Sequence, residues 1–475
     1  MRAESHEAAD QLFQGQPHFT IMNAARLPHR ADSNALSAVR KVGNSMINPA
    51  RHRLGSLLVA AMIAALVAAC ATTDQVGASP AAVWREAYQS SPAEYDVVIP
   101  ANFTPPKDLR IPPEMLERLK PHPPVTGTLR SRLAVAVAGT EVRIRVSNEE
   151  SDKPLSVAAA SVGLAAGEFD AQPGSLRPLT FGGRPGIVIP PGAPAVSDPV
   201  PMSVSVGSEL VVSLHTPSGV AMKPFGGALL ATADGDQTAT EKLAGAGSII
   251  GRPLVSGVAV LTRRPPRIIV AFGDSITDGN RANLGELRSW PEELQHRLAA
   301  RSSGPALAVI DAGIGGNRVI LGGWGRAAVA RFDRDVARID GVSHLVVLEG
   351  INDIGNAGKS LFGDSPPLDT ADLIGGYRQL IVRAHARGIR VIMATLLPFS
   401  GAKYFSPAKE QQRAAVNQWI RTSGEPDAVI DFDAIMRDPG EPARLRADYD
   451  SGDHLHPGNA GYKAMGDAID LKLFD

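Results

Sequence analysis

The chain reads RIIVAFGDSITDGN from Arg267 to Asn280. The first six residues of this stretch are largely apolar, which predicts a strand buried on both faces. The strand stops at a Gly-Asp-Ser turn, so the hydroxyl of Ser275 follows directly beyond its carboxyl end. Ligands of open parallel sheets bind at the carboxyl ends of the strands, beside helix N-termini. Ser275 is therefore the first candidate functional residue.

The sequence on either side of this turn predicts a parallel sheet. From Pro266 onward, apolar strand candidates alternate with helical stretches, and the connections are long enough for helical crossovers. The strand candidates are RIIVAF, ALAVIDA, SHLVVLE, RVIMATLL and AVIDFD, and the helical stretches lie around 291–301, 328–338, 370–387, 407–422 and 459–473. This alternation predicts a three-layer α/β/α sandwich over residues 266–475.

The region before it has a different pattern. In EVRIRVSN, Val142, Ile144 and Val146 alternate with polar residues, which is typical of a half-buried strand. LAVAVAG, GIVIPPG, PMSVSVG and ELVVSLHT are similar short runs bounded by glycine, proline or serine. Together they predict a β-sandwich accessory domain over residues 125–262. The proline-rich segment 71–124 predicts an extended tether, which Trp84 and Tyr88 hold to the folded body.

The N-terminal part of the chain indicates export. Residues 46–70 combine basic residues, an apolar run and small residues before Cys70, which is the layout of a signal peptide. The letters VAAC resemble the lipobox of bacterial lipoproteins, so Cys70 is a candidate for acylation and the protein for the outer membrane; plain export with a chance cysteine is the alternative. Residues 1–45 fit neither, and we expect synthesis to start at Met46.

Charge and cysteine content narrow the possible partners. Lys and Arg number 48 against 49 Asp and Glu, and no basic block of the kind that binds phosphates stands out, so we expect no nucleic-acid partner. Cys70 is the chain's one cysteine, which excludes an intramolecular disulfide and a cysteine zinc site.

For Ser275 to act as a nucleophile, it needs a base for its proton and hydrogen-bond donors for the oxyanion, and the residues after other strands supply candidates for both. A serine hydroxyl attacks only when a positioned base takes its proton. In SGDHLHPGNAGY, Asp453 precedes His456 by three residues, close enough for the carboxylate to orient the imidazole. DAGIGGNR offers a glycine amide at Gly315 or Gly316, and LEGIND offers the side-chain amide of Asn352, as donors to an oxyanion.

The stretches around Ser275, Gly316, Asn352 and Asp453–His456 are called the four blocks below. At these blocks the chain resembles the SGNH subgroup of the GDSL hydrolases, and the resemblance covers residues 267–475. The resemblance implies a flavodoxin-like α/β/α domain in which Ser275 is the nucleophile and Asp453 and His456 complete a triad. It also implies an oxyanion hole made by the N–H of Ser275, the N–H of Gly316 and the side chain of Asn352, and it implies no cofactor. Ile276 stands where the family's name has leucine.

Several residues near these blocks have two interpretations. His454 and His456 form an HxH pair that could hold a metal, but no second ligand cluster accompanies them, so we expect none. Asp274 is expected to bond backbone amides of its own turn. Arg318 could bind a polar substrate group or pair with a carboxylate, and Trp324 could stack on a sugar ring or belong to the core or a lid.

These observations predict an exported serine esterase that removes short acyl groups, with acetyl favoured, from carbohydrate. A lipid-type esterase, lysophospholipase or thioesterase uses the same chemistry and is the nearest alternative. A surface protein in which the sandwich binds glycan and the C-terminal domain is a scaffold is the alternative of another class. Membrane association is expected through the lipid anchor only.

Overall fold

The computed structural model describes residues 81–93, 124–221, 228–279, 289–360 and 363–475. The predicted leader, the signal segment 46–70 with Cys70, and most of the predicted tether lie outside these residues. Within the described ranges, no helix has the length and apolar character needed to cross a membrane.

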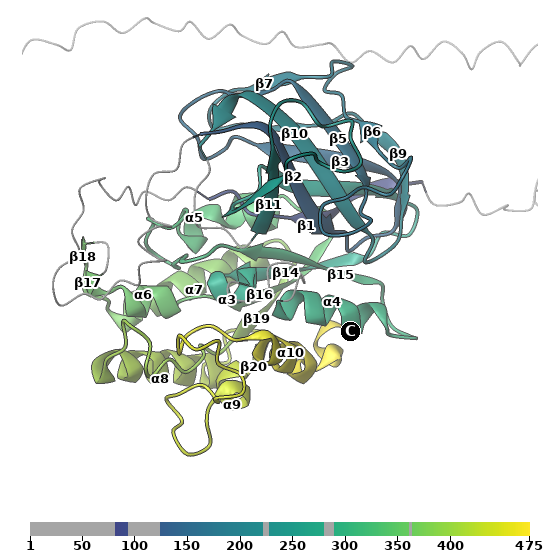
Figure 1. Cartoon of the computed structure of the whole chain (residues 1–475). Coiled ribbons are helices and arrows are strands. Elements are labelled where there is room, and N and C mark those ends of the chain that lie inside the picture. Colours follow the sequence, from purple (N-terminus) through teal and green to yellow (C-terminus); the bar gives the residue numbers. More distant parts are fainter. Residues whose placement is uncertain (1–80, 94–123, 222–227, 280–288, 361–362) are drawn as a thin grey trace, which may run out of the picture. The chain divides into compact units, whose positions relative to one another are not determined.

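Two antiparallel sheets form the N-terminal sandwich (Figure 1). One contains β1 (Val83–Gln89), β13 (Val255–Thr262), β3 (Gly139–Ser147) and β8 (Pro194–Val196) in that order, with β9 (Val200–Val204) also on β3. The other contains β12 (Gly247–Gly251), β11 (Ala228–Ala233), β2 (Val125–Ala134), β10 (Glu209–Val220), β5 (Ala159–Leu164) and β6 (Arg177–Pro178). A separate pair joins β4 (Leu155–Val157) to β7 (Ile187–Ile189). Val142, Ile144 and Val146 are fully buried, because strand alternation turns them all to the inner face.

Strand β1 corrects the tether prediction. Residues 83–89 do not form a tether but pair antiparallel with β13, where Trp84 lies opposite Leu261. The guanidinium of Arg143 lies 4.4 Å from the centroid of the Trp84 ring, and Glu86 forms an ion pair with Arg145 at 2.7 Å. Nε2 of Gln89 donates to the backbone oxygen of Asp335 in the C-terminal domain. The strand is therefore part of the sandwich and also contacts the next domain.

The C-terminal domain is built on five parallel strands. Their spatial order is β15 (Leu307–Gly313), β14 (Arg267–Gly273), β16 (Val342–Leu348), β19 (Arg390–Ala394) and β20 (Ala428–Ile430). Numbered along the chain, this order is 2-1-3-4-5, the flavodoxin-like order with its switch point between the first and third strands. That switch point lies between β14 and β16, so the Gly-Asp-Ser turn follows the strand beside it.

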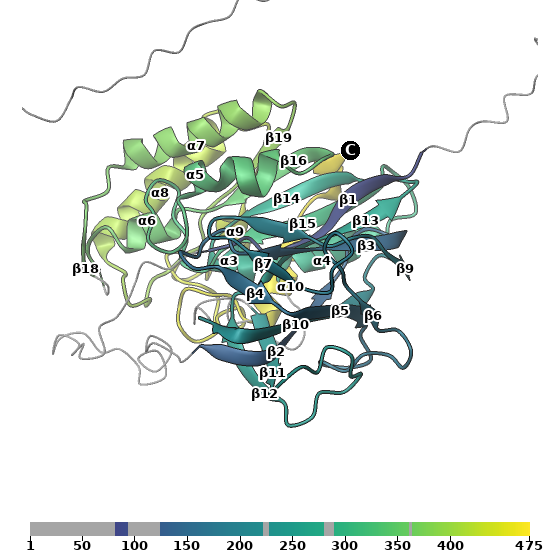
Figure 2. The ribbon, with the colours of Figure 1, turned by 90° about the horizontal axis from the view of Figure 1, so that it is seen from above.

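Helices cover both faces of this sheet, which confirms the predicted three-layer fold (Figures 1 and 2). α4 (Trp290–Ala299), α9 (Phe432–Met436) and α10 (Asn459–Ala468) form one group, and α5 (Ala328–Phe332), α7 (Thr370–His385) and α8 (Pro407–Thr422) form the other. The predicted helix 459–473 is interrupted: α10 ends before Ile469, and Asp470 caps a separate turn over Leu471–Phe474 by accepting from the N–H of Lys472.

Candidate active site

The turn after β14 positions Ser275. A Cβ on Gly273 would lie 2.2 Å from Oγ1 of Thr277, so this position has no room for a side chain. Asp274 caps the short helix α3 (Ser275–Asp278) by accepting a hydrogen bond of 2.9 Å from the N–H of Ile276. Gly279 ends the helix with a φ of 80°. Ser275 is thereby the first helical residue and is held at the end of a central strand.

Ser275, His456 and Asp453 form one hydrogen-bonded chain. Oγ of Ser275 lies 2.8 Å from Nε2 of His456. Nδ1 of His456 lies 2.7 Å from Oδ2 of Asp453, whose other oxygen accepts from the backbone N–H of His456 at 2.9 Å. A carboxylate beside Nδ1 favours the tautomer with its proton there, which leaves the Nε2 lone pair directed at the serine hydroxyl.

A second carboxylate shapes the loop that carries this pair. Oδ1 of Asp450 accepts from the N–H of Gly452 at 2.8 Å and from that of His454 at 3.0 Å, and Oδ2 lies 2.5 Å from Nδ1 of His454. The two rings of the HxH pair thus have different carboxylate partners. His454 has a φ of 62°. Across the ranges that the structure describes, no group of three or more His, Cys, Asp and Glu side chains is placed to hold a metal.

Strand register brings the oxyanion candidates beside the serine. Gly273 is level with Gly313 of β15 and with Leu348 of β16, so the residues after all three strands meet at one edge. Asn352 lies in the short helix α6 (Ile351–Gly355) after β16, and its Nδ2 donates to the backbone oxygen of Asn317 at 3.1 Å.

Of the two glycines that the sequence offers, Gly316 and not Gly315 occupies a position that only glycine can fill. Gly316 has a φ of 77°, and a Cβ there would lie 2.9 Å from the Trp324 ring. The nearest atom to a Cβ on Gly315 is 3.9 Å away, in Asp278, so that position could accept a side chain. Among the described residues, the N–H groups of Ser275 and Gly316 donate no hydrogen bond, which leaves both available to a ligand.

Arg331 supports the site from beneath, although no sequence motif marks it. It is fully buried, and it donates to the backbone oxygens of Gly273 at 2.9 Å and Ala312 at 2.7 Å. Its Nε donates to Oδ1 of Asn317 at 2.8 Å, and its guanidinium pairs with the buried carboxylates of Asp335 and Glu349. Arg331 therefore ties together the ends of two strands and the loop behind Gly316. Only the sheet register could have revealed it, since nothing local in the sequence distinguishes it.

Two aspartates beside the blocks bond backbone amides. Besides Asp274, Asp353 accepts from the N–H of Val319 at 2.8 Å and from that of Ile320 at 3.2 Å. Burial raises the pKa of Asp274 to about 7 and the pKa of Asp353 to about 6, although their amide bonds and nearby cations lower both. Both carboxyls hold the chain segments that carry the candidate residues.

The predicted substrate residues have distinct surroundings. The ring of Trp324 covers Gly316 and packs with Ala93 and Ile314. Arg318 donates to the backbone oxygen of Gly322 and, at 3.3 Å, to Oγ of Ser365, and burial lowers its pKa. Trp324 therefore lies beside the backbone N–H of Gly316, which is a candidate oxyanion donor, whereas Arg318 connects two loops through its hydrogen bonds.

The C-terminal domain was compared with known families and with solved structures. Residues 271–464 match the model of the GDSL-like Lipase/Acylhydrolase family. A GDSL-like lipase from Bacteroides thetaiotaomicron VPI-5482 is 19% identical over 43% of this chain and 88% of its own, with a TM-score of 0.32. An acetyl xylan esterase is 19% identical over 42% of this chain and 96% of its own, with a TM-score of 0.34. The search of curated proteins gave no match.

Proposed function

We propose that Ser275, His456 and Asp453 perform ester hydrolysis in this chain, which is a serine hydrolase that acts on ester bonds and whose residues 271–464 match the GDSL-like Lipase/Acylhydrolase family. One observation carries this assignment above all: the serine hydroxyl lies 2.8 Å from an imidazole whose other nitrogen lies 2.7 Å from a carboxylate. Both contacts fall within hydrogen-bonding reach.

In the proposed reaction, Nε2 of His456 takes the proton of Ser275 as Oγ attacks the ester carbonyl. The tetrahedral intermediate collapses, the C–O bond to the alcohol breaks, and the alcohol leaves with the proton from His456. Water then attacks the acyl-serine, giving one proton to His456, and the acid departs as Ser275 regains its hydrogen. Asp453 holds the ring and stabilises the imidazolium that forms in each step.

The oxyanion is proposed to bind the N–H of Ser275, the N–H of Gly316 and the side-chain amide of Asn352. An amide nitrogen carries two hydrogens, and one of those on Asn352 is used by the backbone oxygen of Asn317. That bond fixes the orientation of the amide and leaves its second hydrogen for the substrate. Preorganised donors of this kind stabilise the transition state without a cost of reorientation.

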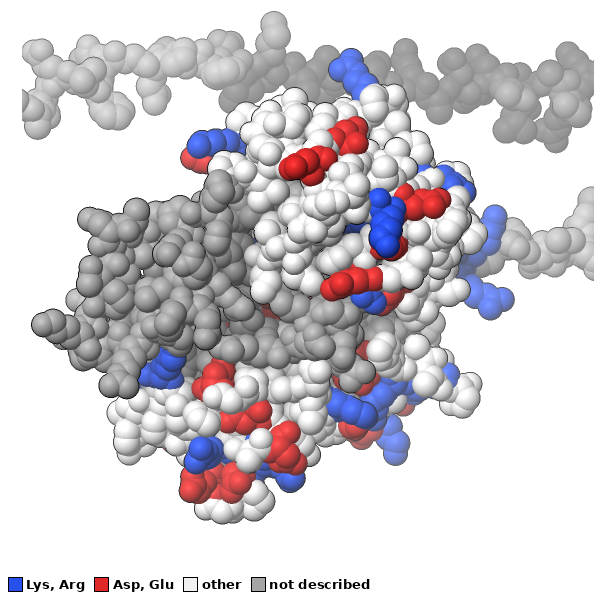
Figure 3. Space-filling view, in the orientation of Figure 1, with Lys and Arg blue, Asp and Glu red and all other residues white. Residues whose placement is uncertain are grey.

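We propose short acyl groups, with acetyl favoured, on a carbohydrate as the substrate. The Trp324 ring beside Gly316 supports a sugar at this position, because an indole face can stack on a sugar ring. Export with acylation of Cys70 would place the enzyme where extracellular glycans occur. On the face in Figure 3, acidic and basic side chains are interspersed among the described residues, so that face offers no continuous basic surface to a polyanion.

The substrate test compares p-nitrophenyl esters of increasing acyl length with acetylated xylan, using the wild type and Ser275→Ala. We expect activity that is highest with acetyl, release of acetate from xylan, and loss of both in Ser275→Ala. A preference for long acyl chains would favour the lipid-type alternative. Esterase activity retained in purified, folded Ser275→Ala would contradict the mechanism.

The glycan-binding alternative is also tested with the full-length protein, because the sandwich includes β1, which lies outside residues 125–262. If the sandwich does not bind glycan, full-length Ser275→Ala should not bind deacetylated xylan, which lacks the ester groups that the proposed active site recognises. Retention on immobilised deacetylated xylan would support a binding role for the sandwich.

A further inference from the structure

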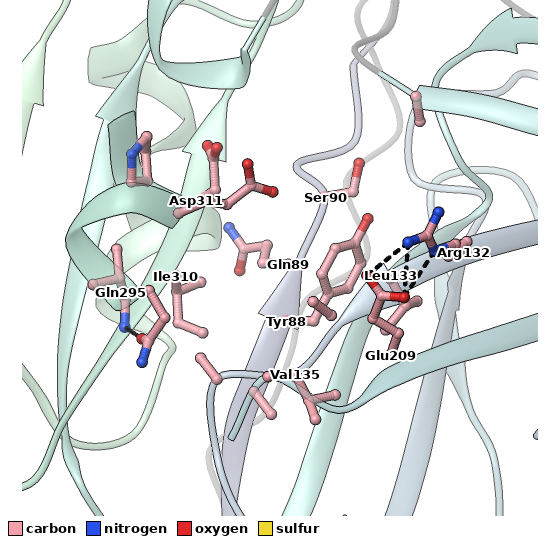
Figure 4. Close-up of a pocket in the computed structure, with 18 of the residues that line it drawn as sticks. Tyr88, Gln89, Ser90, Arg132, Leu133, Val135, Glu209, Gln295, Ile310 and Asp311 are labelled. Carbon is pink, nitrogen blue, oxygen red and sulfur yellow. Dashed lines mark hydrogen bonds and ion pairs between the residues drawn. The ribbon is translucent and has the colours of Figure 1, made fainter. Parts of the chain in front are cut away.

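A cavity of about 540 Å³ lies between the sandwich and the C-terminal domain (Figure 4). Its sandwich side is formed by β1 and β2, and its other side by α4 and β15. Ser275, His456 and Asp453 are not among the described residues that line it, so it is separate from the proposed active site. Small-molecule sites have this size and occur preferentially at domain interfaces.

The middle of the cavity is apolar. Leu133 of β2 and Val135, just after the end of β2, face Ile310 of β15 across it (Figure 4). Tyr88 of β1 stands on the sandwich side with its hydroxyl toward Ser90. These walls would accommodate a short alkyl or ring body.

The C-terminal side of the cavity carries an excess of carboxyl groups. Asp311, Glu292 and Asp278 line it, and of these Asp278 forms the ion pair with Arg252, at 3.0 Å. Oδ1 of Asp311 accepts from the N–H of Gly313, and Oε2 of Glu292 accepts from the hydroxyl of Ser289. Burial raises the pKa of Asp311 well above its usual value and that of Glu292 to about 7, and repulsion by nearby carboxylates, Asp278 among them, raises both further. A cation in the cavity would offset this repulsion.

A buried acceptor on the sandwich side of the cavity has no donor among the described residues. Gln89 is only 4% exposed, and its Nε2 donates to Oγ of Ser91 and to the backbone oxygen of Asp335, both at 3.2 Å. No described residue donates to its Oε1. Figure 4 shows the amide extending from β1 toward the side of the cavity that carries Asp311. A buried acceptor left unsatisfied costs free energy, which a ligand with N–H donors would recover.

We propose that this cavity binds a small organic ammonium ion, with its N–H groups toward Asp311, Glu292 and Gln89 and its apolar body against Leu133 and Val135. A neutral alcohol or sugar would donate hydrogen bonds but would not offset the charge. A bare metal ion does not fit, because the described carboxyls do not converge as metal ligands. The inference is independent of the proposed reaction, since none of its residues takes part in it.

The test measures binding of n-butylammonium chloride to the full-length wild-type protein by calorimetry. Its controls are n-butanol, which lacks the charge, and tetramethylammonium chloride, which lacks the N–H donors, at equal ionic strength. We expect one saturable site for n-butylammonium and affinity lower by about tenfold or more for each control, the equivalent of one good hydrogen bond or ion pair.

Two variants localise the binding. Asp311→Asn and Glu292→Gln should each weaken n-butylammonium binding by about tenfold, because each removes a carboxyl that can ionise beside the ammonium and keeps the shape. Glu441→Gln changes an exposed carboxylate outside the cavity lining and should leave the affinity unchanged. Thermal unfolding of each ligand-free variant verifies that it folds.

Three results would overturn the proposal. The first is equal affinity for n-butanol and n-butylammonium, and the second is unchanged affinity in both cavity variants. The third is loss of binding after Ser275 has been blocked by a phosphonate, which would place the ligand in the active site. If the esterase proposal failed instead, with Ser275→Ala fully active, binding in the cavity would be unaffected.

Discussion

Two histidine–aspartate pairs share one loop and differ in what their histidines face. In the first pair, Nδ1 of His456 lies 2.7 Å from Asp453, and in the second, Nδ1 of His454 lies 2.5 Å from Asp450. The His456 ring is nearly buried and its Nε2 meets Ser275. The His454 side chain is 34% exposed and packs on Gly401. A carboxylate beside an imidazole is therefore not enough to identify a candidate base. The candidate is identified by the group that its second ring nitrogen faces, which for His456 is the hydroxyl of Ser275.

The largest effect is expected from removal of the first histidine. His456→Ala should lower kcat/KM by about 10⁴-fold or more, because among the described residues no other base lies within hydrogen-bonding distance of the serine hydroxyl. Initial rates on p-nitrophenyl acetate measure the loss, and circular dichroism verifies the fold. A rate within about 100-fold of the wild type would remove His456 from the proposed role of base.

Next comes the acid of the same pair. Asp453→Asn should lower kcat by about 10²–10⁴-fold, because a neutral amide cannot hold the same tautomer or stabilise the imidazolium. KM for p-nitrophenyl acetate should change little, since Asp453 contacts His456 rather than the ester. An unchanged kcat would show that the 2.7 Å contact has no part in turnover.

The matched substitution in the second pair should act mainly on stability. Asp450→Asn replaces a carboxylate that accepts two backbone amides and faces His454, so we expect the free energy of unfolding to fall by about 1–3 kcal/mol in urea titrations. Activity of the folded protein should fall by less than about tenfold. A loss of kcat as large as that of Asp453→Asn would erase the distinction between the pairs.

The smallest effect is expected at His454. Asparagine tolerates the positive φ of this position, so His454→Asn should keep the loop and change kcat/KM by less than about threefold. The two single histidine variants should therefore differ by at least about 10³-fold in rate when they are assayed side by side. A large loss in His454→Asn would give that ring a direct role with the substrate.

Local sequence pattern predicts the main strands and helices of the C-terminal domain and the contact between Asp453 and His456. The strands and helices follow from apolar runs and their spacing, which are properties of short stretches of the chain. The contact follows from two residues that lie within one loop, so few backbone conformations separate the carboxylate from the imidazole.

Other features depend on residues far apart in the sequence. The sequence did not predict β1, because the prolines that follow it indicated an extended tether. Its pairing with β13 joins segments about 170 residues apart in the chain. The role of Arg331 follows from the register of two strands, and the cavity exists only where two domains meet. The pairing of His454 with Asp450 depends on a left-handed backbone at a residue that is not glycine. None of these has a local signature.

The central claim is that Ser275 is the nucleophile and His456, not His454, activates it. The most direct test is labelling by an ethyl fluorophosphonate, with the modified peptide identified and its rate of formation followed by mass spectrometry. We predict a label on Ser275 that forms equally fast in the wild type and His454→Asn, at least about 100-fold more slowly in His456→Ala, and not at all in Ser275→Ala. A label on another residue, or an unchanged rate in His456→Ala, would contradict the claim.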